Sequence, residues 1–95
     1  MRTAAKVDRN HKETVDALRK VGASVQSLAS IGKGCPDLLV GYHGTLYLME
    51  VKDGLNVPSK QLLTDDQKKW HEAWTGSPVY VVRSIEQALK ILGER

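Results

Sequence analysis

The first part of the chain has the hydrophobic periodicity of a helix. Between residues 7 and 21, one stripe of inward-facing positions recurs at spacings of three and four, as in an amphipathic helix. The stripe consists of Val7, His11, Thr14, Leu18 and Val21. Gly22 follows directly, and glycine is common just beyond a helix C-terminus. The pattern therefore predicts a first helix over residues 7–21.

Four later segments have the composition of strands. Residues 23–28 alternate small or apolar with polar side chains, as a short half-buried strand does. Residues 37–42 (DLLVGY) and 45–52 (TLYLMEVK) are apolar runs separated only by His43-Gly44, a spacing typical of an antiparallel hairpin. Residues 79–83 (VYVVR) are rich in β-branched side chains and predict a buried strand.

Two capping signals predict the remaining helices. Thr64-Asp65-Asp66-Gln67 has the T-x-x-Q form of a capping box and opens a helix to about Trp74. Ser84-Ile85-Glu86-Gln87 has the same form and opens a helix to Leu92. Residues 30–36 and 53–63 contain the glycines and prolines of loops.

The predicted order is α-β-β-β-α-β-α, in a single α/β domain over residues 1–95. The hairpin requires an antiparallel pair, whereas the helix between the last two strands favours a parallel crossover. Together these connections predict a mixed sheet flanked by helices.

Composition narrows the class of protein. An apolar fraction of 41% argues against wholesale disorder, and no run approaches the ~20 apolar residues of a membrane span. A single cysteine and the lack of an apolar stretch behind the basic N-terminus suggest a reducing, cytoplasmic setting without a signal peptide. The formal net charge of +3 mildly favours a polyanionic partner.

The hairpin brings three charged residues to one end of the sheet. Asp37 opens one strand and lies roughly opposite Glu50, near the end of the other. Glu50 and Lys52 are two residues apart and point to the same face. Two carboxylates beside the loop Gly32–Gly34 suit a hard cation such as Mg²⁺ or Mn²⁺, and a nearby lysine can orient water or stabilise developing charge.

A simple alternative is a solvated salt bridge at a strand end, worth ~0–1 kcal/mol. Against it, Glu50 and Lys52 interrupt an otherwise apolar strand whose Met49 and Val51 face the opposite side. Charge in that position is costly unless a partner such as a metal compensates for it.

The spacing of several motifs resembles the PD-(D/E)XK nucleases. The chain has G-K-G-C-P-D at residues 32–37, M-E-V-K at 49–52, L-T-D-D-Q at 63–67, and V-Y-V-V-R-S at 79–84. In order and spacing these are similar to the VRR-NUC (virus-type replication-repair nuclease) domain in its stand-alone, phage-like form. The similarity spans residues 8–92 and implies a restriction-endonuclease-like fold.

The resemblance assigns roles position by position. It implies that Asp37 and Glu50 bind the metal, that the carbonyl of Val51 adds a ligand, and that Lys52 positions the nucleophilic water. It places Gln67 near the site, whereas the local sequence explains Gln67 equally well as the last residue of a capping box.

The first helix departs from the family pattern, which has a metal-facing glutamate there. Glu13 matches by residue type, but its helical phase points it outward, as a solvated surface acid. Aligning the apolar positions puts the family's glutamate near Val7 or Asp8. Of these two, we expect Asp8 to be the additional metal ligand, with His11 as a neighbour facing the site.

Basic side chains are expected around this site. We expect nucleic-acid contacts from Lys33, Gly34, Lys60 and Lys68, with Lys69 nearby, through phosphates and without base specificity. Trp70 and Trp74 are four residues apart and are expected to pack on the sheet or on a second subunit.

These observations predict a Mg²⁺- or Mn²⁺-dependent DNA endonuclease. The family resemblance favours branched DNA, a Holliday-junction-resolvase-like activity in replication and repair, and a homodimer. The main alternatives are a non-catalytic nucleic-acid-binding module on the same fold, and a structural protein with a coincidental motif.

Overall fold

The fold was analysed in a computed structural model that describes residues 10–55, 58 and 62–93. Seven elements follow the predicted order. Their bounds are α1 His11–Lys20, β1 Ser24–Ser27, β2 Leu38–Tyr42, β3 Thr45–Val51, α2 Asp65–Ala73, β4 Val79–Val82 and α3 Ile85–Ile91. Each lies within the range predicted from the sequence. Asp8 and Lys60 lie outside the described residues.

The four strands form one mixed sheet in the order β1-β2-β3-β4. The pairs β1–β2 and β2–β3 are antiparallel, and β3–β4 is parallel. The predicted hairpin is present, with Tyr42 paired to Thr45 across a two-residue turn. His43 and Gly44 have φ angles of 47° and 79°, and two successive positive values are the signature of the type I′ turn that matches strand twist.

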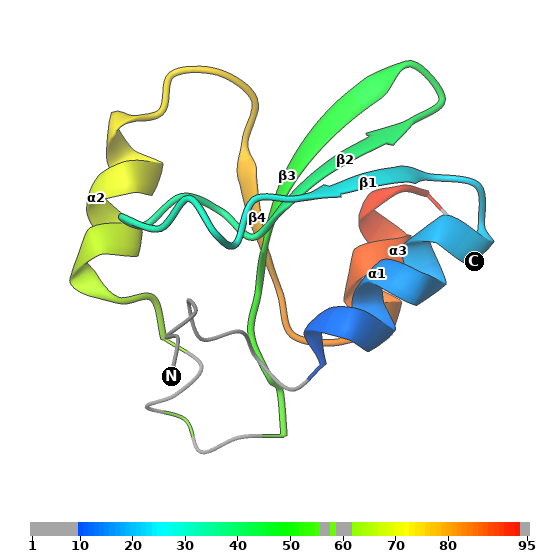
Figure 1. The fold of residues 1–95 in the computed structure, drawn as a ribbon, viewed down its shortest axis with the longest axis horizontal. Helices are drawn as coiled ribbons and strands as arrows, with labels where there is room; N and C mark the ends of the chain where they lie inside the picture. Colours follow the sequence, from blue (N-terminus) through cyan, green and yellow to red (C-terminus); the bar gives the residue numbers. More distant parts are fainter. Residues whose placement is uncertain (1–9, 56–57, 59–61, 94–95) are drawn as a thin grey trace.

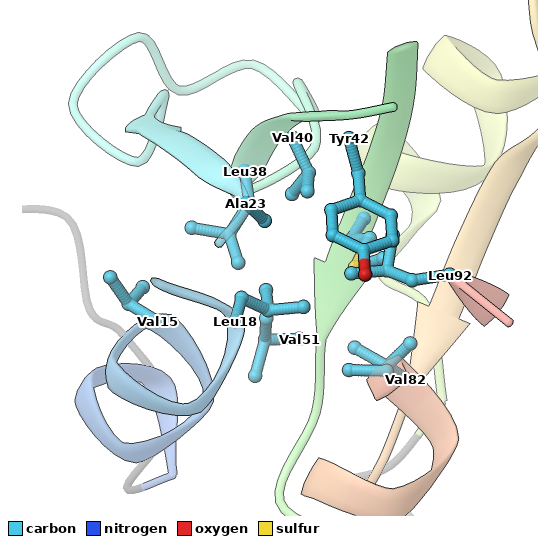
Figure 2. Close-up of a cluster of buried hydrophobic side chains, with 11 residues drawn as sticks. Val15, Leu18, Ala23, Leu38, Val40, Tyr42, Val51, Val82 and Leu92 are labelled. Atoms are coloured by element: carbon cyan, nitrogen blue, oxygen red, sulfur yellow. The ribbon is translucent and has the colours of Figure 1, made fainter. Parts of the chain in front are cut away.

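The sheet buries one face against two helices. Alternate residues of β2 and β3, such as Val40 and Val51, point into a core to which α1 contributes Leu18 and α3 contributes Ala88. Figure 2 shows the labelled members of this core, among them Leu18, Val40 and Val51, between the sheet and the helices. α1 and α3 also contact each other on this side.

The other face of the sheet is covered much less completely. Figure 1 shows α2 on the side of the sheet opposite α1 and α3. None of the residues of α2 is fully buried, in contrast to Thr14, Val15 and Leu18 of α1. The more open face is therefore the one on which polar groups from β3 and α2 can meet. In the described part of the chain, no helix is long and apolar enough to cross a bilayer.

The two capping signals differ in their outcome. Thr64 and Gln67 form the complete predicted capping box at the start of α2. At α3, the Ser84 hydroxyl accepts from the backbone N–H of Gln87 at 3.1 Å, as predicted. The side-chain oxygen of Gln87, however, does not accept from the N–H of Ser84 as a capping box requires. It accepts at 2.7 Å from the backbone N–H of Arg83, one residue before the cap. The side chain of Gln87 therefore closes the turn between β4 and α3.

Gly34 fixes the loop before β2 against the start of α2. Its φ is +85°, and a β-carbon built on it would lie 2.2 Å from the carbonyl oxygen of Asp66. Gly32, in the same loop, has φ +73° but no neighbouring atom within 4 Å of such a β-carbon. Only Gly34 therefore combines a left-handed backbone with close backbone contact.

This difference predicts the stability of two alanine variants. Gly32→Ala should lose about 1–2 kcal/mol of unfolding free energy through its left-handed backbone alone. Gly34→Ala should lose a further ~1–3 kcal/mol because the loop must move away from α2. Urea denaturation of both proteins measures the difference; equal losses would show that the loop does not pack on α2 as described.

Candidate active site

Asp37 enters the site at the point where the glycine loop becomes β2. The preceding Pro36 is fully buried and anchors the end of the loop. The pairing of Leu38 with Met49 continues by one residue to place Asp37 opposite Glu50, as predicted. The Asp37 carboxylate accepts a hydrogen bond of 2.8 Å from the backbone N–H of Val51. It is therefore held against the end of β3.

The same hydrogen bond indicates the direction of the Val51 carbonyl. In a strand, the N–H and C=O of one residue leave the backbone on the same side. Since the N–H of Val51 points to Asp37, its carbonyl is directed toward the Asp37 side as well. The backbone geometry is thus compatible with the role that family resemblance assigns to Val51.

Glu50 and Lys52 are buried charges. Their relative exposures are 1% and 7%, respectively. Met49 and Val51 belong to the core, so the alternation of β3 sends Glu50 and Lys52 to the face on the side of α2. The alternative of a solvated surface salt bridge is wrong, because both charged groups are removed from bulk water.

Gln67 joins these two residues. Its amide nitrogen donates to Glu50 Oε2 at 3.1 Å, and its carbonyl oxygen accepts from Lys52 Nζ at 2.9 Å. The same oxygen accepts from the backbone N–H of Thr64 at 2.9 Å. The two sequence interpretations of Gln67 therefore hold together, since one side chain caps α2 and fixes the relative positions of the carboxylate and the ammonium group.

The backbone of Lys52 is also fixed on both sides. Its N–H donates to the carbonyl of Val82 at 2.9 Å. Its carbonyl accepts at 3.0 Å from the side-chain amide of Asn10, the residue just before α1. The N-terminal end of α1 consequently lies beside the backbone of Lys52. Asp8, the additional acid expected from the sequence, precedes this end of the helix.

The negative charges of Glu50 and Asp37 act on the nearby Cys35 thiol. The pKa of Cys35 is raised, first by burial and then by the negative charges of Glu50 and Asp37. Both carboxylates therefore act on one region beside the glycine loop. Cys35 is partly exposed and is free, and its raised pKa favours the unreactive thiol.

His71 is a site-facing residue that the sequence did not reveal. It lies one turn beyond Gln67 on α2, and its side chain is 15% exposed. Its Nε2 atom is 4.0 Å from Glu50 Oε1. The pKa of His71 is lowered, first by burial and then by the positive charge of Lys52, so the neutral imidazole is favoured. The four-residue spacing from Gln67 was the available signal.

The predicted tryptophan pair lies next to this histidine, toward the C-terminal end of α2. The rings of Trp70 and Trp74 stack with centroids 4.7 Å apart, and Trp70 meets His71 edge-on at 6.3 Å. Trp74 remains 46% exposed. The pair thus packs mainly within α2 and does not enter the core.

The remaining residues considered for the site differ in how far they are buried. His11 is partly buried, and its Nδ1 has no hydrogen-bond partner. Glu13 is exposed, as its helical phase predicted. Lys33, Lys68 and Lys69 are exposed around the glycine loop and α2, where they are available to a polyanion.

The donor set suits a divalent cation of the magnesium type. Across residues 10–55, 58 and 62–93, no three His, Cys, Asp or Glu side chains are gathered closely enough to hold a metal on their own. Mg²⁺, however, usually binds one or two carboxylates and retains several waters. Asp37 and Glu50 supply such a pair, and the buried, unpaired Nε2 of His71 beside Glu50 marks a position suited to a further polar partner.

Comparison with known proteins shows the family to which the chain belongs. No family model and no curated protein matched the chain. Among solved structures, one described as a "VRR_NUC domain" matches with a TM-score of 0.64 and 31% sequence identity. The match covers 90% of this chain and 91% of that one. Because identity of this level extends over nearly the whole length of both chains, the protein belongs to the VRR-NUC family of nuclease domains.

Proposed function

We propose that the protein is a divalent-metal-dependent endonuclease that hydrolyses phosphodiester bonds in DNA. The observation that carries the proposal is the pair of buried charges, Glu50 and Lys52, joined by Gln67 at the sheet end where Asp37 is bound to Val51. Buried charges are costly for stability and are typically retained where function needs them. A module that only bound DNA would have no need for this group.

Asp37 and Glu50 would hold Mg²⁺ or Mn²⁺, together with the carbonyl of Val51. The bound ion would supply Lewis-acid stabilisation of a phosphoryl oxygen and an acidified water. The hydrogen bond from the Val51 N–H orients the Asp37 carboxylate at the end of β3. The hydrogen bond from Gln67 orients Glu50 in the same way.

Lys52 would act on the nucleophile and on the developing charge. Its ammonium group is held by the Gln67 carbonyl at 2.9 Å, and its backbone by Val82 and Asn10. A group fixed before the reaction begins needs little reorganisation to stabilise charge in the transition state. The low exposure of Lys52 strengthens this effect, because less water screens the interaction.

The exposed lysines would contribute the affinity for DNA. Lys33 and Lys68 flank the contact between Gly34 and the start of α2, and Lys69 follows on the helix. Contacts from flexible lysines to phosphates carry no base information. The proposed binding is therefore insensitive to sequence and strongly weakened by salt.

Asp8 is proposed as an additional metal ligand. The hydrogen bond from Asn10 to Lys52 supports this, since residue 8 precedes Asn10 by only two positions. Asp8→Asn should reduce cleavage, whereas Glu13→Gln should be nearly silent because Glu13 is exposed. Initial rates at saturating Mn²⁺ compare the two variants. If Asp8→Asn cleaves DNA at the wild-type rate and Glu13→Gln cleaves it more slowly, then Glu13 and not Asp8 is the additional metal ligand.

A homodimer acting on branched DNA is the preferred version of this function. Large apolar side chains remain exposed, including Ile31 (60%), Leu46 (56%) and Trp74 (46%). A twofold dimer could present two equivalent sites to the two equivalent strands of a four-way junction. Such an interface should bury at least ~1,000 Å² in total.

The test is cleavage of end-labelled linear, flap and four-way DNA with and without Mn²⁺, combined with light scattering of the free protein. The proposal expects metal-dependent cleavage, fastest on four-way DNA, by a dimer. A monomer that cleaves linear DNA equally well would overturn the resolvase-like version. Binding of all three substrates without any cleavage would instead support the non-catalytic module.

A further inference from the structure

His71 lies at the proposed metal centre but has no role in the mechanism described so far. Its Nε2 atom is buried and makes no hydrogen bond to any described residue. A buried polar atom left unpaired destabilises the folded protein. The position of this histidine therefore requires an explanation beyond packing.

The distance between His71 and Glu50 is informative. Nε2 and Glu50 Oε1 are 4.0 Å apart, which is too far for a hydrogen bond. Two donor atoms that each lie ~2.0–2.2 Å from one ion are separated by at most about 4.4 Å. The observed separation is therefore within the range that one shared cation can bridge.

The neighbouring residues hold the imidazole in this direction. Gln67, one turn earlier on the same face of α2, binds Glu50 Oε2 and leaves Oε1 as the oxygen that faces His71. Trp70 lies against the imidazole edge-on and is itself stacked on Trp74. The indole of Trp70 thus restricts the rotation of the imidazole beside it.

We propose that His71 is a nitrogen ligand of the metal centre, joining Glu50 on the α2 side. The inference rests on the proposed function, because it assigns a further ligand to the same ion. Imidazole favours transition metals over Mg²⁺, whereas carboxylates alone do not. His71 therefore makes the centre selective for metals such as Mn²⁺ and Co²⁺. Within the described residues, Asp37, Glu50 and His71 are not gathered closely enough to hold an ion as they stand, so the ion must draw α2 toward the two carboxylates as it binds.

Electron spin echo spectroscopy of bound Mn²⁺ tests this directly, because it detects nitrogen nuclei bonded to the ion. Wild-type protein should show coupling to ¹⁴N that becomes coupling to ¹⁵N when the histidines are labelled. The coupling should disappear in His71→Ala and persist in His43→Asn, which alters only the exposed hairpin turn. The preference for Co²⁺ over Mg²⁺, measured by competition, should fall about tenfold in His71→Ala.

The outcomes distinguish this inference from the function on which it rests. Mn²⁺ bound through Asp37 and Glu50 without histidine coupling would overturn the role of His71 and leave the nuclease proposal intact. Coupling that persists in His71→Ala would do the same. If the folded wild-type protein binds no Mn²⁺ at all, the proposed metal centre fails and the inference fails with it.

Discussion

Lys52→Met is expected to reduce the single-turnover rate of DNA cleavage by about 10²–10³-fold, the usual loss when one charge-stabilising group is removed. Methionine retains most of the buried aliphatic stem and removes only the ammonium group. Gln67 can still accept from the N–H of Thr64, so the cap of α2 should survive. Because Lys52 is proposed to act in the transition state, much of the DNA affinity should remain.

The measurement needs a control for the loss of one positive charge. Lys90→Met removes a charge from an exposed position on α3, on the other side of the sheet. It should cleave at nearly the wild-type rate. If Lys52→Met cleaves as fast as Lys90→Met, then Lys52 has no catalytic role. Circular dichroism and urea denaturation of each variant show whether a slow enzyme is also an unfolded one.

Asp37→Asn is expected to remove measurable binding of Mn²⁺ and, with it, cleavage. Asparagine has nearly the same shape, and its side-chain oxygen can still accept the Val51 N–H now bound at 2.8 Å. The substitution therefore removes the charge while keeping the geometry. A neutral amide is a much poorer partner for a divalent cation than a carboxylate.

Isothermal titration with Mn²⁺ measures this effect without reference to activity. Asp16→Asn is a matched control, because Asp16 is an exposed acid on α1 that pairs with Lys12 at 2.7 Å. Its Mn²⁺ affinity should equal that of the wild type. Equal affinity in Asp37→Asn would exclude Asp37 from the metal site and would leave its hydrogen bond to Val51 as its only role.

The sequence was sufficient for the fold because the local signals were strong and consistent. The two-residue His43-Gly44 turn set the register of β2 and β3, and that register alone places Asp37 opposite Glu50. The two capping motifs located the beginnings of α2 and α3. The second motif was only half correct, since whether Gln87 bonds to the N–H of Ser84 or of Arg83 depends on how β4 enters the helix.

The site was less completely predictable because it depends on contacts between distant elements. Asp37, Glu50 and Lys52 belong to one hairpin, so their proximity follows from sequence spacing. His71 approaches Glu50 because α2 lies over this face of the sheet. Its four-residue spacing from Gln67 puts it on the same side of the helix but does not place the helix on the sheet. Gln67 is an intermediate case. Its sequence context predicted the bond to Thr64 at the helix cap, and the same side chain also bonds to Glu50.

The most direct test of the proposed function is metal add-back to a single preparation of wild-type protein. Protein freed of divalent ions with EDTA is mixed with labelled four-way DNA, and cleavage is followed before and after Mn²⁺ or Mg²⁺ is supplied in excess. We expect no cleavage in EDTA and rapid cleavage after addition of either ion, with Lys52→Met remaining inactive throughout. Cleavage that continues in EDTA, or a folded, DNA-bound wild-type protein that stays inactive with both ions, would contradict a metal-dependent nuclease centred on Asp37, Glu50 and Lys52.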